Sequence, residues 1–359
     1  MKSLLTILIL LSFNSLANSQ MNEINSPIKN FDQLWKEFDL RYANFELKKI
    51  DWDDIYEKYR SLVNENTKNI KLLEICCSML HELNDGHVMI QPRFEEVDDI
   101  ECGAPYEFSL DIEFNTSKKF IEFESLIIKE LTTNGFSESI KTYLSEDTKF
   151  QYRLSENFAY LRFDEMTEKH TFGKFKRTVD HSIEAFQNKK GLIIDLRFNG
   201  GGRDYYAYLL ARRFIPKGKS VCHYERERIK GTDSYTAMKY KEFTAAGRYQ
   251  FTGPIVILTS DFTASACEVF LLVMMDLPNV TIIGDATEGI FSDMYPFKLP
   301  NKWIATLSHQ QYFSQSKENF EGKGISPDIQ MVNSHADLKT KSDPVINAAI
   351  EFLREECNR

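Results

Sequence analysis

A serine stands at the predicted junction between a strand and a helix. The segment Asp261–Glu268 reads Asp-Phe-Thr-Ala-Ser-Ala-Cys-Glu, between an apolar strand predicted over 255–258 and an apolar helix predicted over 264–275. Backbone N–H groups at a helix N-terminus are unpaired and partly positive, so they can stabilise an oxyanion formed when a hydroxyl attacks a carbonyl. Ser265 is therefore a candidate nucleophile, with the N–H of Ala266 as one oxyanion donor. A plain helix-capping role for Ser265 is the alternative.

A glycine-rich turn offers a second donor. The segment Asp195–Gly202 reads Asp-Leu-Arg-Phe-Asn-Gly-Gly-Gly and follows a hydrophobic strand predicted over 191–196. Consecutive glycines let the main chain turn sharply and approach a ligand closely, so Gly200 or Gly201 could complete an oxyanion hole. Neither phosphate-binding pattern, GxxxxGK[ST] or GxGxxG, is present. An ordinary tight turn remains the other interpretation.

Two further motifs supply a base and an acid. His87 ends the run Leu-Asn-Asp-Gly-His after a predicted helix, and Glu321 opens the loop Glu-Gly-Lys-Gly-Ile-Ser-Pro-Asp. Taken singly, each is equally compatible with a structural histidine or a solvated turn. No HExxH and no paired His/Cys cluster indicates a metal. We expect neither a metal nor an organic cofactor.

The order of these motifs carries more information than any one of them. Leu-Asn-Asp-Gly-His, the Asp195–Gly202 run, Ser-Ala-Cys-Glu, Gly284–Gly289 and Glu321–Asp328 follow one another as the motifs of tail-specific (C-terminal processing) proteases do. The resemblance covers roughly residues 30 to 332. It implies an α/β fold with a ClpP/crotonase-like core of stacked sheets and helices and an N-terminal helical lobe.

One position departs from that family. Its members use a Ser–Lys dyad, and the matching turn here, Thr287–Gly289, is followed by Ile290, which cannot accept a proton. The chain also resembles the tricorn-core branch, which uses Ser, His and Glu. That resemblance implies Ser265 as nucleophile, His87 as base and Glu321 as the acid that orients it, with acyl-enzyme hydrolysis of peptide bonds.

Two other interpretations stay open. Retinoid-binding modules resemble this fold and lack peptidase activity, so the chain could be an inactive binding module. The second open interpretation is a Ser–Lys peptidase with a displaced lysine, such as Lys323. The family usually carries a PDZ domain of ~90 residues, and the stretch 88–157 is too short for one and has no carboxylate-binding loop of that type. The expected partner is a peptide or an unfolded protein.

The elements that must position these residues follow from hydrophobic spacing. Three amphipathic helices over 31–42, 51–62 and 72–83 predict a helical lobe at 26–87. A connecting region spans 88–157, with strand-like pieces at 106–114 and 120–123. Strands and helices then alternate through a catalytic core at 158–356, which argues for an α/β sheet, and polar residues 216–250 are expected to form an exposed excursion.

The N-terminus and the composition indicate where the chain acts. Lys2, an apolar run over 4–13 and small residues before position 20 predict a signal peptide at 1–19, hence a periplasmic or extracellular protein. No other segment reads as a stable membrane span. The net charge of -9 disfavours a nucleic-acid partner. Six cysteines show no scaffold spacing, and we interpret most as small buried hydrophobes.

Overall fold

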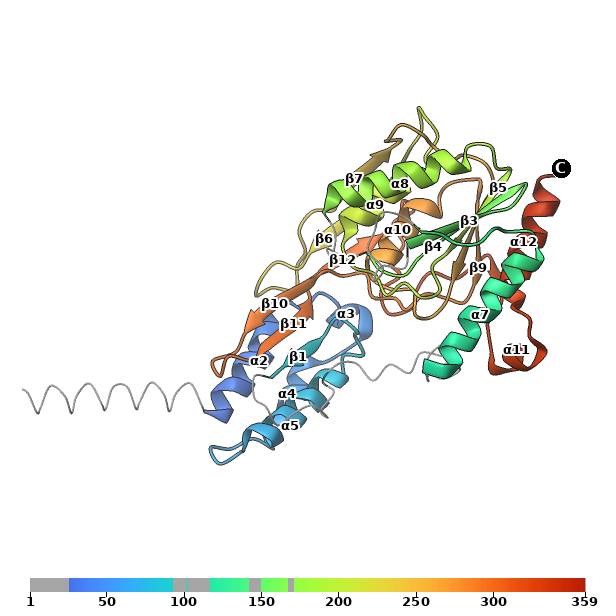
Figure 1. The fold of residues 1–359 in the computed structure, drawn as a ribbon. Helices are drawn as coiled ribbons and strands as arrows, with labels where there is room; N and C mark the ends of the chain where they lie inside the picture. Colours follow the sequence, from blue (N-terminus) through green and yellow to red (C-terminus); the bar gives the residue numbers. More distant parts are fainter. Residues whose placement is uncertain (1–25, 93–101, 103–116, 142–149, 167–170, 359) are drawn as a thin grey trace, which may run out of the picture. The chain divides into compact units, whose positions relative to one another are not determined.

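The computed structural model describes residues 26–92, 102, 117–141, 150–166 and 171–358, and the predicted signal peptide lies outside this part (Figure 1). The chain divides into two compact units. We call them the helical unit, made of the described residues up to 102 with Glu227–Thr236 and Ser292–Gln310, and the sheet unit, made of the described residues of 117–226, Ala237–Phe291 and 311–358. Within the described ranges, no helix is long and apolar enough to cross a membrane.

The helical unit begins with the helices that the spacing predicts. They are α2 (Pro27–Arg41), α4 (Trp52–Arg60) and α5 (Asn69–His81). The short helix α3 (Phe45–Lys48), which the spacing does not predict, lies between α2 and α4 in the sequence. Asp51 caps α4 as expected, since its carboxylate accepts the N–H of Asp54 at 3.1 Å. Apolar side chains three and four residues apart, such as Phe31, Leu34 and Phe38, are fully buried in this unit's own core.

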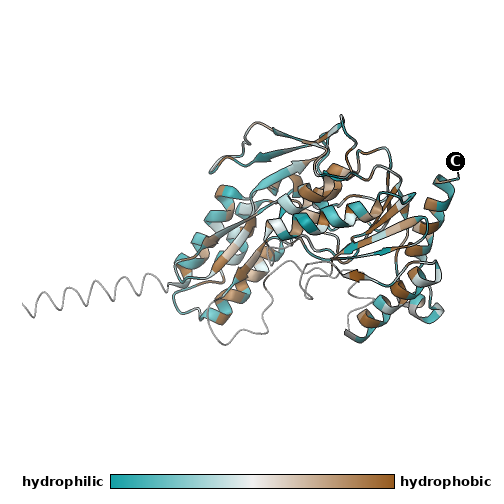
Figure 2. Ribbon diagram, turned by 45° about the horizontal axis from the view of Figure 1, so that its top comes forward, coloured by the Kyte–Doolittle hydropathy of each residue, from teal (hydrophilic) through white to brown (hydrophobic). Residues whose placement is uncertain are grey.

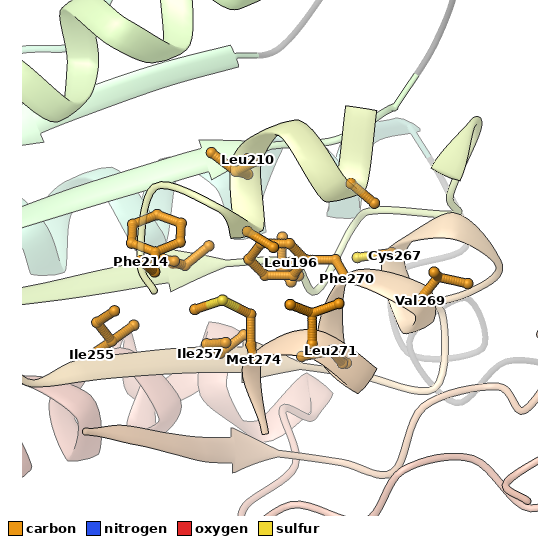
Figure 3. Packing of buried hydrophobic residues seen from close by; sticks show 14 of the residues in the cluster. Leu196, Leu210, Phe214, Ile255, Ile257, Cys267, Val269, Phe270, Leu271 and Met274 are labelled. Atoms are coloured by element: carbon orange, nitrogen blue, oxygen red, sulfur yellow. The ribbon is translucent and has the colours of Figure 1, made fainter. Parts of the chain in front are cut away.

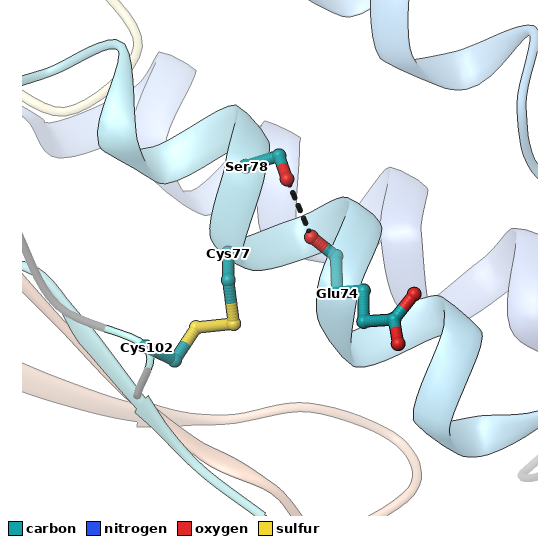
Figure 4. The surroundings of a disulfide bond; sticks show 4 residues. All are labelled: Glu74, Cys77, Ser78 and Cys102. Atoms are coloured by element: carbon teal, nitrogen blue, oxygen red, sulfur yellow. Dashed lines mark hydrogen bonds between the residues drawn. A yellow bond between two sulfur atoms is a disulfide. The ribbon is translucent and has the colours of Figure 1, made fainter. Parts of the chain in front are cut away.

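A small antiparallel sheet completes the helical unit. Its strand order is β1 (Met89–Gln91), β11 (Ile304–Ser308) and β10 (Met294–Lys298). A disulfide joins Cys77 on α5 to Cys102, whose carbonyl accepts the N–H of Ile90 on β1 at 3.2 Å (Figure 4). The remaining cysteines are free, and Cys76, Cys222 and Cys267 are buried, in line with their interpretation as small hydrophobes.

The sheet unit is built on one large mixed sheet. The described residues form seven strands in the order β13 (Ile329–Gln330), β9 (Val280–Gly284), β8 (Ile255–Thr259), β5 (Gly191–Asp195), β4 (Phe158–Phe163), β3 (Phe150–Leu154) and β2 (Ile140–Lys141). The strands from β13 to β4 are parallel, and β3 and β2 are antiparallel. The predicted alternation of strands and helices is therefore confirmed.

Helices cover both faces of this sheet because its central strands are apolar on both sides. Leu192, Ile194 and Ile257 pack with helices α8 (Phe172–Phe186), α9 (Asp204–Ala211) and α10 (Ala266–Met274). Figure 3 shows Ile257 beside Leu271 and Met274 of α10. Ile193 and Val256 point to the other face, against α7 (Ser117–Thr133) and α12 (Pro344–Glu356). Figure 2 shows apolar residues gathered on the strands and on the inner sides of these helices.

Two sequence expectations need correction. Residues 120–123 are not a strand but part of α7, where Phe123, Leu126 and Ile127 share a buried face at helical spacing. The excursion at 216–250 contains two paired strands, β6 (Ser220–Glu227) and β7 (Lys239–Thr244); half of the residues of β6 are buried, whereas β7 is mostly exposed. These strands join β12 (Gln310–Phe313) in a second sheet. The strand expected at 106–114 lies outside the described residues. The short α11 (His335–Thr340) precedes α12.

Candidate active site

Ser265 occupies a strained backbone position between β8 and α10. Its φ of 57° and ψ of -126° lie in a region that residues with a side chain rarely adopt. The turn is held on both sides, because the N–H of Ala264 donates to the carbonyl of Asn199 at 3.1 Å and the N–H of Ser265 donates to the Glu268 carboxylate at 3.0 Å. The hydroxyl-bearing carbon is thus fixed at the N-terminus of α10.

Glu268 is the residue that organises this turn. Its fully buried carboxylate accepts four hydrogen bonds: from the Ser265 N–H, the Thr287 hydroxyl at 2.5 Å, the Gly289 N–H at 2.7 Å and the Ile290 N–H at 2.9 Å. Burial raises the pKa of Glu268 to about 7, and the four donors act in the opposite direction. In the sequence, Glu268 is only the last residue of the Ser-Ala-Cys-Glu motif, because three of its four partners lie 19 to 22 residues further along the chain.

The glycine loop packs directly against the serine. Gly201 has a φ of +97°, and a Cβ added there would lie 2.6 Å from the Ser265 Cβ and 3.0 Å from the Ala266 nitrogen. The glycine loop therefore lies close to Ser265, as an oxyanion role for this loop would require. The Gly201 N–H already donates to the Asn199 side chain at 2.9 Å, so the exposed Gly200 is the better candidate for the second oxyanion donor.

The other polar residues of this loop are structural supports. Arg197 is 1% exposed, and its guanidinium donates to Asp195 at 2.7 and 2.9 Å and to Asp343, the cap of α12, at 2.9 Å. The Asn199 amide donates to the Phe163 carbonyl at 3.0 Å. These bonds anchor the end of β5, from which the glycine loop departs.

Glu321 lies in a loop that continues the Glu268 network. Its buried carboxylate accepts the N–H of Phe291 at 2.9 Å, directly after Ile290. The same two loops are joined by the N–H of Gly322, which donates to the Gly289 carbonyl at 2.7 Å. Within the sheet unit, hydrogen bonds thus connect Ser265 through Glu268 and the 287–291 loop to Glu321.

Two residues, Ile290 and Lys323, bear on whether a lysine could act as the base. Ile290 is 6% exposed, so the position that carries the dyad lysine in Ser–Lys proteases is filled here by a buried alkyl side chain. Lys323 is half exposed, and its ammonium pairs with Glu318 at 2.8 Å. The Lys323 side chain is therefore engaged at the surface with Glu318.

His87 belongs to the helical unit. It is 6% exposed, and its Nδ1 has no hydrogen-bond partner among the residues that the structure describes. Burial lowers the pKa of His87 below 6.5, while the charges of Asp85 and Asp293 and a hydrogen bond with the Ser292 backbone oppose that shift. The Thr306 hydroxyl donates to the His87 carbonyl at 2.7 Å. The imidazole is therefore mainly neutral at neutral pH, as a general base must be.

Two family models match the chain. Residues 157–331 match peptidase family S41, and residues 27–81 match the tricorn protease C1 domain. The carboxy-terminal-processing protease of Bartonella bacilliformis is 29% identical over 185 residues, which are 50% of this chain and 40% of that protein. The carboxy-terminal processing protease CtpA of Bacillus subtilis is 29% identical over 42% of this chain and 30% of its own length. The chain thus spans less than half the length of these curated relatives.

Solved structures match over nearly the whole chain. A structure described as a putative peptidase from Parabacteroides merdae is 27% identical, covers 92% of this chain and 97% of its own, and has a TM-score of 0.76. Mature CPAF, at 12% identity and a TM-score of 0.65, covers 93% and 96%. The tricorn protease, at 18% identity and a TM-score of 0.58, covers 94% of this chain and 37% of its own. The last two show a shared fold, and they bear out the expected core architecture.

Proposed function

Because the chain carries a peptidase family S41 domain preceded by a tricorn protease C1 domain, we propose that it is a serine peptidase. Its substrate is a peptide or an unfolded protein, and Ser265, His87 and Glu321 are its nucleophile, base and orienting acid. The observation that carries the proposal is the backbone of Ser265. Strain is stored there, a glycine loop packs against it, and a buried carboxylate holds it at a helix N-terminus.

The proposed chemistry is a two-step acyl transfer. The Ser265 hydroxyl attacks the peptide carbonyl while His87 takes its proton, and the N–H groups of Ala266 and Gly200 stabilise the oxyanion. His87 then returns that proton to the leaving amine as the C–N bond breaks. Water attacks the remaining ester while His87 takes its proton, and His87 returns that proton to the Ser265 oxygen as the ester C–O bond breaks, which releases the acid and the free serine. The Glu321 carboxylate supports the imidazolium that forms in both steps.

The buried Ile290 specifically favours a histidine base over a lysine base. An isoleucine side chain has no amine, and Lys323, the displaced-lysine candidate, is half exposed and paired with Glu318. The same isoleucine would also suit a non-catalytic binding module, so the two functions must be separated by activity rather than by stability.

The decisive test of activity is the Ser265→Ala variant in a peptide-cleavage assay. Loss of a triad serine costs on the order of 10⁶-fold in turnover, so we expect no measurable cleavage, with an unchanged thermal midpoint because the hydroxyl is used chemically. Lys323→Ala is the matched control and should stay within a few-fold of wild type. Undiminished cleavage by Ser265→Ala would refute the proposal.

We also propose that the protein is exported and acts in the periplasm or outside the cell. The basic start and short apolar run support a signal peptide, and a disulfide between Cys77 and Cys102 suits an oxidising compartment. N-terminal sequencing of the mature protein should give a first residue near Gln20. Secreted material that still began at Met1 would contradict this.

A further inference from the structure

Asp85 is a buried charged group that the proposed mechanism does not use. It is 1% exposed in the helical unit, two residues before His87, and its carboxylate receives three hydrogen bonds. We propose that Asp85 is the positioning residue for His87: its carboxylate fixes the backbone of the base and acts electrostatically on the imidazole. This inference rests on the proposed role of His87.

The geometry links Asp85 to His87 through the main chain. Oδ1 of Asp85 accepts the backbone N–H of His87 at 3.0 Å, and the carbonyl of Asp85 accepts the N–H of Val88 at 3.0 Å. The turn starts at Asn84, which has a φ of +43°. A short side chain that bonds its own backbone two residues on is the standard way to lock such a turn. With Thr306 holding the His87 carbonyl, little backbone freedom remains at the base.

Three other elements hold Asp85 itself in place. The Tyr42 hydroxyl, at the end of α2, donates to Oδ2 at 2.7 Å, and the Ser308 hydroxyl on β11 donates to Oδ1 at 3.1 Å. The Lys48 ammonium lies 3.7 Å from Oδ2 and donates to the carbonyls of Leu83 and Asn84 at 3.0 and 2.7 Å. A helix end, a strand and a lysine thus converge on one carboxylate.

The charge of Asp85 acts on the imidazole as well as on the backbone. Among the residues that the structure describes, the charged groups with the largest effect on His87 are Asp85 and Asp293, which favour the imidazolium, and Lys48, which opposes it. Burial alone would make His87 a poor proton acceptor, so a fixed negative charge nearby offsets part of that effect. Asp85 therefore stabilises the imidazolium from within the helical unit.

The Asp85→Asn variant removes the charge of this side chain and keeps its shape. An amide oxygen at Oδ1 can still accept from His87 and Ser308, and an NH₂ at Oδ2 can donate to the Tyr42 hydroxyl. We expect the acid limb of the rate profile to move by about one unit toward lower pH. The plateau should fall roughly three- to tenfold because the base is weaker. KM should be unchanged. Tyr42→Phe keeps the charge and loses one bond, so its acid limb should match that of wild type.

A titration of the His87 ring by NMR makes the inference testable without turnover. In a Ser265→Ala background, Asp85→Asn should lower the His87 pKa and Tyr42→Phe should not. If neither the titration nor the acid limb moved in a folded Asp85→Asn protein, Asp85 would be structural only and the inference would fail. If instead the His87 titration moved but no variant, wild type included, cleaved a peptide, the proposed function would fail and the positioning role would stand.

Discussion

Single residues account for most of the chemistry that we propose. Ser265, His87 and Glu321 could be chosen from residue type and motif order, because the family pattern fixes their sequence context. Glu268 could not be assigned a role, because each of its partners in the 287–290 loop is brought to it only by the fold. The hydrogen bond that the Gly201 N–H donates could not be predicted either, because it depends on the orientation of the Asn199 side chain.

The Glu268 network gives a first prediction. In the Glu268→Gln variant, an NH₂ group faces donors that share one carboxylate oxygen in the wild-type protein. At least one buried donor then loses its acceptor, which costs about 1–3 kcal/mol of stability per donor. We expect a lower free energy of unfolding, measured with urea at pH 8, and a turnover at least roughly a hundredfold below wild type because the Ser265 turn relaxes. Thr287→Ser keeps its hydroxyl and is the control. Wild-type turnover in a folded Glu268→Gln protein would show that the network is dispensable.

The buried imidazole gives the second prediction. Because burial lowers the pKa of His87, the neutral base persists to a lower pH than for an exposed histidine. Activity should rise with pH along a limb centred below about 6.5 and then level off. A kcat/KM profile from pH 4 to 9 on a neutral peptide measures this. A limb centred well above pH 7 would point instead to a lysine base.

At the scale of elements, strand and helix positions followed from hydrophobic spacing, with one instructive failure. The window 120–123 is rich in aromatic and branched residues, which favours a strand when read alone. In the longer window of α7, Phe123, Ile127 and Leu131 recur every four residues, and the buried face they form decides the helix. Tertiary packing, not local propensity, therefore determines the secondary structure of this segment.

The disulfide is the element-scale feature with the clearest consequence. It closes a chain segment with a sequence separation of 25 that contains His87. In the chain-entropy model, such a crosslink is worth about 3 kcal/mol of stability. The double variant Cys77→Ser/Cys102→Ser should lower the unfolding free energy by about that amount, and reduction of wild type should do the same. Cys76→Ser, beside the pair but not in it, distinguishes loss of the crosslink from loss of a buried sulfur. Equal stability of oxidised and reduced wild type would contradict this.

At the scale of the whole molecule, the α/β core and a helical lobe could be predicted from the sequence. The later chain segments that complete the helical unit could not. That unit takes up 227–236 and 292–310 from the middle of the later sequence. Strand β11 pairs with β1 across more than two hundred residues, and no local pattern encodes such a pairing. The helical lobe and core expected at 26–87 and 158–356 therefore remain a sequence-based division, which limited proteolysis can examine.

The central claim is that Ser265 is a nucleophile activated by His87, and a fluorophosphonate probe followed by peptide mass spectrometry tests it most directly. Reaction requires an activated serine but no knowledge of the substrate. We predict one modified peptide containing Ser265, no modification in Ser265→Ala, and labelling slowed by orders of magnitude in His87→Ala but not in Lys323→Ala. Labelling at another residue, or full labelling of His87→Ala with none of Lys323→Ala, would contradict the account.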